Sequence, residues 1–573
     1  MKKIIPVFVA IVLIAVIGWL TFGKKVAEKY TYSDERADLY EYFHIIKEEE
    51  VPIILQDALV EEDAILVDNV CYFDLDTVHK YFNDRFYVDR VEGLLLYTTP
   101  TEIIRTVLGS SVYSVDGMET DAGYTLSFSR IVGEDTIYYI AADFVKQYTN
   151  YSYEVFAQPN RMQVYTQWDQ RTVADVRSDN AVRVLGGVKS PILTDVAAGD
   201  TLVVLDKMET WCEVKTQDGF IGYIENKVLE NERKETPSAV TDYEVPEYTS
   251  LTKDKKIALG WHAVYGKSGN DTLGEVVADA PGMNVIAPTW FSLSDNAGNF
   301  ASFGTKTYVD KAHEMGLEVW GVVDNFNYAA NNKPNNIDTK TVLSATTART
   351  TLIQNLINKA LELGLDGINI DFEKIDASFG QDYVQFLREL SIQCRAKELI
   401  FSVDVPVPFN YNAHYDIAEQ GVVADYVIIM GYDEHGGDSS VAGSVASLGY
   451  VTQGLDIAVS QMPSNKIVNA LPFYTRLWTT EGTKVKSRAY GLSAVKGLLK
   501  EYGMEPSWDE TAGQYYAEKK TDKALYQIWI EDTQSILAKI NVMQKYDLGG
   551  VAAWRLGFET DGVWDAISAY IGN

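Results

Sequence analysis

The chain has 573 residues and a formal net charge of -31 at pH 7. This length is too great for one hydrophobic core, so several domains are expected. The charge disfavours nucleic acid or an anionic membrane surface as the main partner, because either would require clustered Lys and Arg; a neutral or amide-bearing substrate fits better. The three cysteines, Cys71, Cys212 and Cys394, lie far apart, so we expect buried thiols and no disulfide framework, metal site or cofactor.

An uncharged apolar run extends from Ile4 to Phe22, between Lys2-Lys3 and Lys24-Lys25. Its length is close to the ~20 residues with which a helix crosses a bilayer. No small-x-small cleavage site follows directly, so residues 1–25 are predicted to be an uncleaved signal anchor with one transmembrane helix. A cleaved signal peptide is the alternative. Because lysines flank both ends, charge does not decide the orientation.

Residues 30–170 are predicted to be an α+β region with two repeats. Val78 and Tyr81 recur 67 residues later as Val145 and Tyr148, and each copy is expected to form a strand, a short helix and two strands. This arrangement resembles the copper-amine-oxidase N-terminal-like repeats of bacterial envelope proteins. His44 and His79 are interpreted as packed or surface histidines, not as metal ligands.

Residues 178–230 contain short strands at close spacing with turn residues between them, which indicates a small all-β barrel. The ending Gly-Phe-Ile-Gly-Tyr-Ile, residues 219–224, is similar to bacterial SH3 domains, which commonly hold cell-wall material. A spacer barrel without a ligand is the alternative. Residues 231–255 are polar and include Pro237 and Pro246, so a linker is predicted.

Residues 256–573 show eight strand candidates with helical patterns between most of them, which predicts a (β/α)8 barrel. The candidates are residues 257–261, 283–288, 317–324, 367–373, 400–405, 426–432, 467–473 and 550–554. A helix predicted from Arg349 to Leu363 ends at Gly364, a typical C-terminal breaker, and the fourth strand follows within a few residues.

The fourth strand lies in residues 366–373, Asp-Gly-Ile-Asn-Ile-Asp-Phe-Glu. Alternation along a strand places Ile368, Ile370 and Phe372 on one face and the polar residues on the other. In a barrel, the apolar face packs under the helices and the polar face lines the interior, with Glu373 at the mouth. Asp366 has the opposite parity and is interpreted as a structural residue. A solvated acidic surface strand is the alternative.

This octapeptide resembles the D-G-x-D-x-D-x-E signature of glycoside hydrolase family 18, with Asn369 where most members have Asp. Met430-Gly431-Tyr432-Asp433 is similar to the M-x-Y-D motif of the family, and Trp554 matches its aromatic sugar platform. Asn369 and Trp529-Ile530-Glu531-Asp532 resemble the spore-cortex and cell-wall N-acetylglucosaminidases of this family more than the secreted chitinases.

Glycosidic cleavage needs an acid that stays protonated near neutral pH, and a carboxylate at Asp371 would disfavour ionisation of Glu373. The resemblance implies substrate-assisted catalysis, in which the acetamide oxygen of the sugar is the nucleophile. Asp371 would then bind the acetamide N–H, and Tyr432 would donate to its oxygen. The predicted catalytic residues are Glu373, Asp371 and Tyr432.

The sugar is expected to stack on Trp554 and to be held by Asp433. The predicted substrate-binding residues are Asp433, Trp554, Met430, Asn369, Tyr474 and Arg476. His262 and Trp478 follow predicted strands and are further candidates for the glycan groove. His435 beside Asp433 is too weak a signal for a metal site.

Asn369 is the main departure from the family pattern. An Asp at this place can share a proton with the residue that matches Asp371, whereas an amide cannot. The sequence therefore predicts that Asp371 stays ionised and bonded towards Glu373.

Two functions remain open. The first is an envelope glycosidase that hydrolyses β-1,4 bonds at N-acetylglucosamine in peptidoglycan or a chitin-like glycan. The second is a catalytically silent glycan-binding or scaffold protein on the same fold. Retention of Glu373, Asp371 and Tyr432 favours the enzyme. We expect the body of the protein outside the cytoplasm, held at the membrane by the N-terminal helix and at the wall by the SH3-like domain, or secreted after cleavage.

Overall fold

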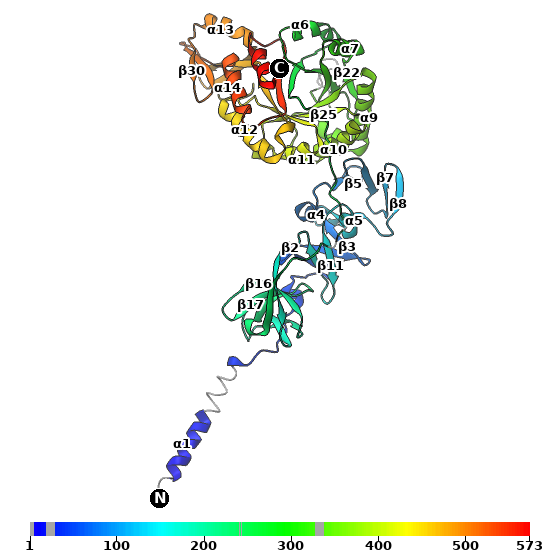
Figure 1. Cartoon of the computed structure of the whole chain (residues 1–573), viewed down its shortest axis with the longest axis vertical. Helices are drawn as coiled ribbons and strands as arrows, with labels where there is room; N and C mark the ends of the chain where they lie inside the picture. Colours follow the sequence, from blue (N-terminus) through cyan, green and yellow to red (C-terminus); the bar gives the residue numbers. More distant parts are fainter. Residues whose placement is uncertain (1–4, 19–28, 240, 242, 327–336, 573) are drawn as a thin grey trace. The chain divides into compact units, whose positions relative to one another are not determined.

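The computed structural model describes residues 5–18, 29–239, 241, 243–326 and 337–572 (Figure 1). The chain divides into two compact units, and each is described by itself. The first unit comprises residues 1–86, 106–114 and 119–245. The second comprises residues 87–105, 115–118 and 246–573.

The N-terminal apolar run forms helix α1 (Ile5–Gly18). The predicted membrane span, residues 4–22, lies partly outside the described residues. Within the described residues, no helix combines the length and the apolar character needed to cross a bilayer. The membrane anchor therefore stays a prediction.

The described residues of the first unit form two seven-stranded sheets. The first sheet has the strand order β11-β12-β1-β2-β3-β10-β9. Its strands are β1 (Glu50–Leu55), β2 (Ala58–Val67), β3 (Val70–Asp74), β9 (Ser127–Val132), β10 (Asp135–Ala141), β11 (Ser152–Phe156) and β12 (Arg161–Tyr165). Three short helices accompany them, namely α3 (Leu39–Tyr42), α4 (Leu75–Tyr81) and α5 (Ala142–Gln147).

The two predicted repeats have the same order of elements in the structure. The first copy runs β3, α4, β4 (Tyr87–Asp89) and β5 (Leu94–Thr98), and the second runs β10, α5, β11 and β12. Val78 and Val145, the matched positions of the two helices, are both 0% exposed. The connecting strands β6 (Ile103–Val107), β7 (Val112–Val115) and β8 (Met118–Asp121) contain residues of both units.

The second sheet has the order β15-β14-β18-β17-β16-β13-β19 and is the predicted small all-β domain. Its strands are β13 (Arg171–Val176), β14 (Asn180–Arg183), β15 (Ile192–Val196), β16 (Thr201–Lys207), β17 (Trp211–Lys215), β18 (Ile221–Glu225) and β19 (Leu229–Glu235). The antiparallel pairing of β13 with β19 extends this sheet beyond the predicted range 178–230 at both ends.

The predicted linker, residues 231–255, is partly ordered structure. Its first residues belong to β19. Further on, the Leu251 N–H donates to Asp425 Oδ1 at 2.7 Å, and the Lys253 N–H donates to the Tyr426 hydroxyl at 2.6 Å. The last part of this segment is therefore bonded to the barrel of the second unit at the start of a strand.

The described residues of the second unit form a closed barrel of eight parallel strands, in the order β20-β33-β27-β26-β25-β24-β23-β21, which the pairing of β20 with β21 completes. The barrel strands are β20 (Ile257–His262), β21 (Val285–Leu293), β23 (Glu318–Asp324), β24 (Gly367–Asp371), β25 (Ile400–Pro406), β26 (Tyr426–Met430), β27 (Ile467–Pro472) and β33 (Gly550–Trp554). The short strand β22 (Phe300–Ser302) pairs antiparallel with β21. The predicted (β/α)8 barrel is confirmed.

Helices follow most of the barrel strands. They are α6 (Leu273–Val277), α7 (Lys306–Glu314), α8 (Thr339–Ser344), α9 (Thr346–Leu363), α10 (Gly380–Ala396), α11 (Ile417–Val423), α12 (Leu448–Gln461), α14 (Thr533–Met543) and α15 (Val563–Ile571). Gly364 ends α9 with a φ of 75°, a left-handed conformation that glycine adopts without strain. The chain then turns directly into β24, as the sequence predicted.

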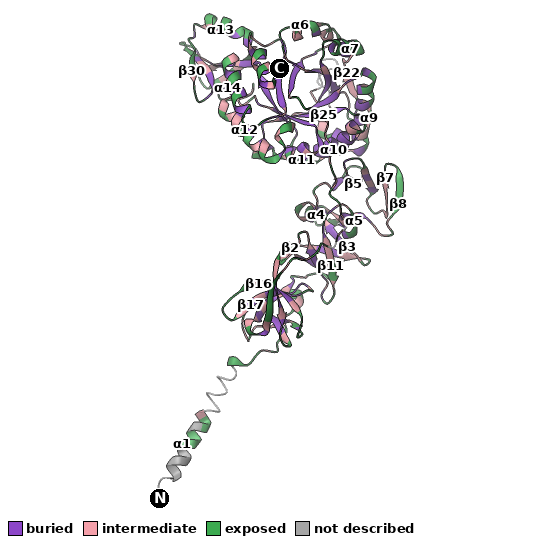
Figure 2. Ribbon diagram, viewed as in Figure 1, coloured by how far each residue is buried: buried purple, intermediate pink, exposed green. Residues whose placement is uncertain are grey.

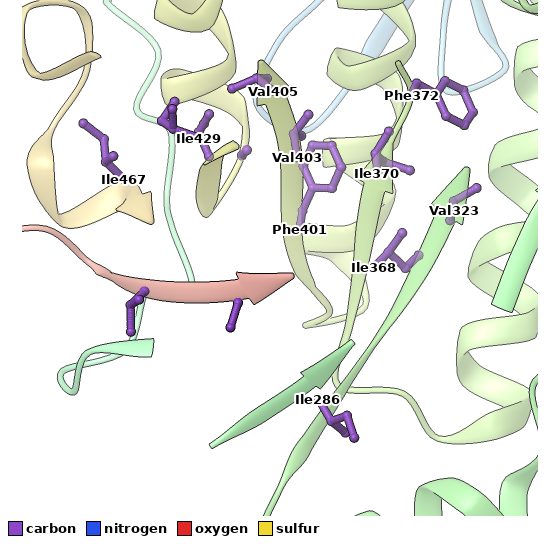
Figure 3. Packing of buried hydrophobic residues seen from close by; sticks show 14 of the residues in the cluster. Ile286, Val323, Ile368, Ile370, Phe372, Phe401, Val403, Val405, Ile429 and Ile467 are labelled. Atoms are coloured by element: carbon purple, nitrogen blue, oxygen red, sulfur yellow. The ribbon is translucent and has the colours of Figure 1, made fainter. Parts of the chain in front are cut away.

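The two faces of β24 alternate as predicted. Ile368, Ile370 and Phe372 are at most 1% exposed and lie in the layer between the strands and the helices (Figure 3). The Phe372 ring stacks on Phe386 of α10 with a centroid distance of 5.6 Å. A second apolar cluster, which includes Trp320, fills the interior of the barrel. Figure 2 shows the barrel strands as buried and the outer helix faces as exposed.

A five-stranded antiparallel sheet is inserted between β27 and α14, with the order β29-β28-β32-β31-β30. Its strands are β28 (Tyr474–Glu481), β29 (Lys484–Gly491), β30 (Ser507–Asp509), β31 (Gln514–Lys520) and β32 (Leu525–Ile530), and helix α13 (Val495–Tyr502) accompanies them. β28 starts two residues after the end of the barrel strand β27, so Tyr474 and Arg476 lie close to the carboxyl-terminal rim of the barrel.

Candidate active site

A cavity of about 360 Å³ opens at the carboxyl-terminal ends of the barrel strands. Its walls are largely aromatic, and its polar groups are mostly carboxyls. The residues that line it are Trp261, Ala263, Val264, Tyr265, Thr289, Ser292, Phe303, Asp324, Phe326, Asp371, Glu373, Asp404, Met430, Tyr432, Asp433, Tyr474 and Trp554. Among the candidates from the sequence, Asn369 and Arg476 are not in this lining.

Glu373 lies two residues beyond β24, and Asn325 holds its backbone. The Glu373 N–H donates to Asn325 Oδ1 at 3.1 Å, and Asn325 Nδ2 donates to the Glu373 carbonyl at 2.9 Å. Burial and the nearby Asp433 carboxylate raise the pKa of Glu373 to about 7. This side chain can therefore hold a proton at neutral pH, as a general acid must. The sequence attributed the effect to Asp371; burial and Asp433 are the larger causes.

Asp371 ends β24 beside three further carboxyls, those of Asp404, Glu373 and Asp324. Burial, Asp404 and Glu373 raise its pKa well above the ordinary value. Its Oδ1 atom is buried, without a hydrogen-bond partner among the described residues. A low dielectric and neighbouring negative charge both favour the protonated form of Asp371, so the structure gives no support to the expectation that it stays ionised and bonded towards Glu373, which stays a prediction.

Asn369 is 0% exposed and lies below the cavity. Its Oδ1 accepts from Trp261 Nε1 at 3.2 Å. Its Nδ2 donates to Asp404 Oδ1 at 2.8 Å and to Ser402 Oγ at 3.0 Å. In the structure, Asn369 thus contacts side chains of the protein at the base of the site, and the substrate-binding role predicted for it has no support in the cavity lining.

The side chains after β26 and on β28 form a polar group at one side of the cavity. The Tyr474 hydroxyl donates to Asp433 Oδ1 at 2.5 Å, and Arg476 Nη2 lies 3.6 Å from the same oxygen. The Tyr432 ring meets the Tyr474 ring edge to face at 6.0 Å. Burial raises the pKa of Tyr432 well above the ordinary value, so its hydroxyl is a proton donor at any physiological pH.

Aromatic rings form the remaining walls. Trp554, the last residue of β33, meets Trp261 of β20 edge to face at 6.0 Å. Tyr265, in the loop after β20, is 67% exposed and also lines the cavity. Aromatic faces of this kind pack against the apolar faces of sugar rings, so the cavity is suited to a glycan.

Two groove candidates from the sequence are wrong. His262 is 2% exposed, and its ring nitrogens bond to the hydroxyls of Tyr308 and Thr272. Trp478 is 0% exposed, and its Nε1 donates to the Gly443 carbonyl at 2.8 Å. Neither side chain is in the cavity lining, and both are enclosed by protein groups.

The sequence analysis missed Asp324, Asn325, Asp404 and Trp261. Asp324 ends β23, where it accepts from Ser292 Oγ at 2.6 Å. Trp261, Asp324 and Asp404 lie on barrel strands and line the cavity, and Asn325 directly follows β23, so their places near the carboxyl-terminal strand ends are the signal that could have found them. Among the described residues, no group of three or more His, Cys, Asp or Glu side chains is arranged to hold a metal ion.

The site thus combines an acid that is protonated near neutral pH, a phenol donor and aromatic walls, which suits cleavage of a glycosidic bond. Residues 320–559 match the sequence profile described as Glycosyl hydrolases family 18. The protein carries a glycosyl hydrolase family 18 domain. Residues 181–230 match the profile of a bacterial SH3 domain, and this range lies within the second sheet of the first unit.

Curated relatives share this domain. An uncharacterized glycosylase of Bacillus subtilis, YvbX, is 28% identical over 330 residues, which are 55% of this chain and 93% of YvbX. The cortical fragment-lytic enzyme of Bacillus anthracis is 26% identical over 237 residues, which are 39% of this chain and 54% of that protein. The chain thus spans about half the length of the second relative. Together with the family match, these relatives identify the protein as a glycoside hydrolase.

Among solved structures, a chitinase from Chromobacterium violaceum is 23% identical, with a TM-score of 0.49 over 56% of this chain and 99% of that one.

Proposed function

We propose that this glycoside hydrolase cleaves β-1,4 bonds at N-acetylglucosamine in peptidoglycan or a chitin-like glycan, with retention of configuration and with the acetamide of the substrate as the nucleophile. The observation that carries the proposal is Glu373, an acid with a pKa of about 7 at the mouth of an aromatic-walled cavity.

In this reaction Glu373 protonates the glycosidic oxygen as the bond to the anomeric carbon breaks. The acetamide oxygen bonds to that carbon on the opposite face and gives an oxazolinium intermediate. Asp371 accepts the acetamide N–H, and the Tyr432 hydroxyl donates to the acetamide oxygen. Water then attacks the anomeric carbon and returns a proton to Glu373, which restores the enzyme.

The state of Asp371 supports the acetamide as the nucleophile. A carboxylate nucleophile must be ionised, whereas burial and three neighbouring carboxyls favour the protonated form of Asp371. Trp554 is one of the aromatic residues that line the cavity and suits stacking against the reacting sugar.

The test uses the full-length protein in detergent with chitin oligomers and purified peptidoglycan. We expect new reducing ends with the β anomer formed first, and inhibition by a thiazoline analogue of the oxazolinium ion. Glu373→Gln should remove activity by a factor of at least about 10². Glu505→Gln is the matched control, because Glu505 is an exposed glutamate of the same domain. An initial α product, or an active Glu373→Gln variant, would contradict the mechanism.

The bacterial cell wall is the favoured source of the glycan. The SH3 domain and the name of the relative from Bacillus anthracis, a cortical fragment-lytic enzyme, support this choice. We further propose that the apolar residues 4–22 hold the protein at the membrane with its body outside. Membrane fractionation after an alkaline wash, with and without this segment, tests the anchor: loss of the full-length protein from the membrane would refute it.

A further inference from the structure

Three carboxyls lie side by side below Glu373. Asp324 of β23 is opposite Asp371 of β24 in the register of these parallel strands. On the other side, Asn369 is opposite Ser402 and Ile370 is opposite Val403, so the next step along the register brings Asp404 of β25 beside Asp371. All three carboxyls line the cavity. Asp404 is 2% exposed and belongs to none of the family motifs in the sequence.

The amide of Asn369 fixes one side of Asp404. The indole of Trp261 can only donate, so the oxygen of Asn369 must face it at 3.2 Å. The NH2 group then faces Asp404 Oδ1 at 2.8 Å. This bond satisfies Oδ1 of Asp404 and leaves its second oxygen for another partner. Asp371 also lacks a hydrogen-bond partner, because its Oδ1 is buried and has none among the described residues.

Electrostatics requires a proton at this place. None of the described residues that line the cavity carries a positive charge. Burial raises the pKa of Asp404 well above its ordinary value, and the negative charge of Glu373 raises it further. The hydrogen bond from Asn369 lowers this pKa, but it does not offset the effect of burial. Two adjacent buried carboxyls cannot both ionise and instead titrate as a pair with one shared proton.

We propose that Asp404 is a positioning residue that shares one proton with Asp371 and takes it up when Asp371 binds the acetamide N–H of the substrate. This inference rests on the proposed substrate-assisted reaction. With the proton already on Asp404, the anionic Asp371 faces the positive charge of the oxazolinium as it forms. When water has opened the ring and the product leaves, the proton is again shared between Asp404 and Asp371, so the pair gains and loses no proton over the cycle.

The groups that face this pair come from six segments, one of which is the stretch between β25 and α11 that carries Tyr415. Glu373 and Asn369 are on the β24 segment, Asp324 is on β23, Ser402 is on β25 itself, Tyr383 is on α10 and Tyr432 follows β26. Only Asp324 and Glu373 among them can be anionic near neutral pH. Both disfavour a second negative charge on the pair.

The experiment compares kcat and its pH dependence for the full-length enzyme, Asp404→Asn and the exchanged double variant Asn369→Asp/Asp404→Asn, with a chitin oligomer as substrate. Asp404→Asn should lower kcat on the order of 100-fold. It should also move the acid limb of the kcat profile upward by about one pH unit or more, because a lone buried Asp371 can lose its proton only to solvent. The exchanged double variant again has a carboxyl next to Asp371. It should therefore restore most of kcat and move the acid limb most of the way back to its position in the wild type.

Controls separate the possible failures. Asp565→Asn, a change at an exposed aspartate of α15, should leave the profile unchanged. Thermal unfolding confirms that each variant is folded. An unchanged acid limb in folded Asp404→Asn, with the wild type active and Glu373→Gln inactive, overturns the inference alone. A wild type that cleaves no acetamido glycan overturns the proposed function and this inference together.

Discussion

The pKa of Glu373 sets the pH range of the enzyme, and Asp433 provides a direct way to change it. An ordinary glutamate with a pKa of 4.5 is protonated about once in 300 molecules at pH 7, whereas Glu373 with a pKa of about 7 is protonated in about half. We therefore expect kcat/KM to fall about tenfold for each pH unit above about 7.

Asp433→Asn removes the second largest cause of this elevation. A nearby negative charge disfavours ionisation, so its removal lowers the pKa of Glu373 and moves the alkaline limb to lower pH. Burial, the larger cause, remains, so the shift should be about one pH unit and should not reach the ordinary value. An asparagine retains an acceptor for the Tyr474 hydroxyl, which bonds Asp433 Oδ1 at 2.5 Å.

The assay is the pH dependence of kcat/KM on a chitin oligomer, compared with Asp438→Asn. Asp438 is an exposed residue of the same loop, so this control makes the same change in net charge. An alkaline limb that stays in place in Asp433→Asn, or that moves equally in both variants, would refute the assignment of the shift to Asp433.

Three further substitutions test other parts of the site and fold. Asn325→Ala releases the backbone of Glu373 and should lower kcat by about tenfold with little change in the alkaline limb, measured by the same pH profile. Trp554→Ala removes an aromatic wall and should lower kcat/KM about 10- to 100-fold, mostly through KM, in steady-state assays. Arg349→Ala leaves the buried Glu389 carboxylate without the ion pair that Arg349 makes at 3.1 Å. We expect denaturant titrations to show a free energy of unfolding lower by about 3–5 kcal/mol. The control Lys500→Ala, at an exposed position, should change it by less than about 0.5 kcal/mol.

The barrel was predictable because local rules decide it. Each strand is a short apolar run, and glycine ends the preceding helix where the chain turns, as Gly364 does before β24. The alternation of Ile368, Ile370 and Phe372 with polar residues assigned both faces of β24 correctly. These signals lie within a few residues of one another, so no knowledge of long-range pairing was needed.

The wrong predictions concern side chains whose surroundings come from distant parts of the chain. His262 was taken for a groove residue because it follows a strand, yet Tyr308 and Thr272 enclose its ring. Trp478 lies on β28 of an inserted antiparallel sheet and is buried, and its Nε1 donates to the Gly443 carbonyl of another loop. A strand-end position indicates which rim a residue is near, but packing from other elements decides whether its side chain reaches the cavity.

Asp404 shows how this limit affected the chemistry. Asn369 showed that the Asp that usually shares a proton with Asp371 is absent. From the sequence alone, Asp371 was therefore predicted to be a carboxylate without a proton-sharing partner. The strand Ile400–Pro406 alternates like any barrel strand, so a single Asp within it had no visible role. Only the parallel register of β24 and β25 brings Asp404 next to Asp371, and only the indole of Trp261 fixes the amide of Asn369 towards it. The neighbouring strand β25 therefore supplies a buried carboxyl beside Asp371. The double variant Asn369→Asp/Asp404→Asn moves this carboxyl to β24, so it tests whether activity needs the carboxyl at position 404 or only a carboxyl next to Asp371.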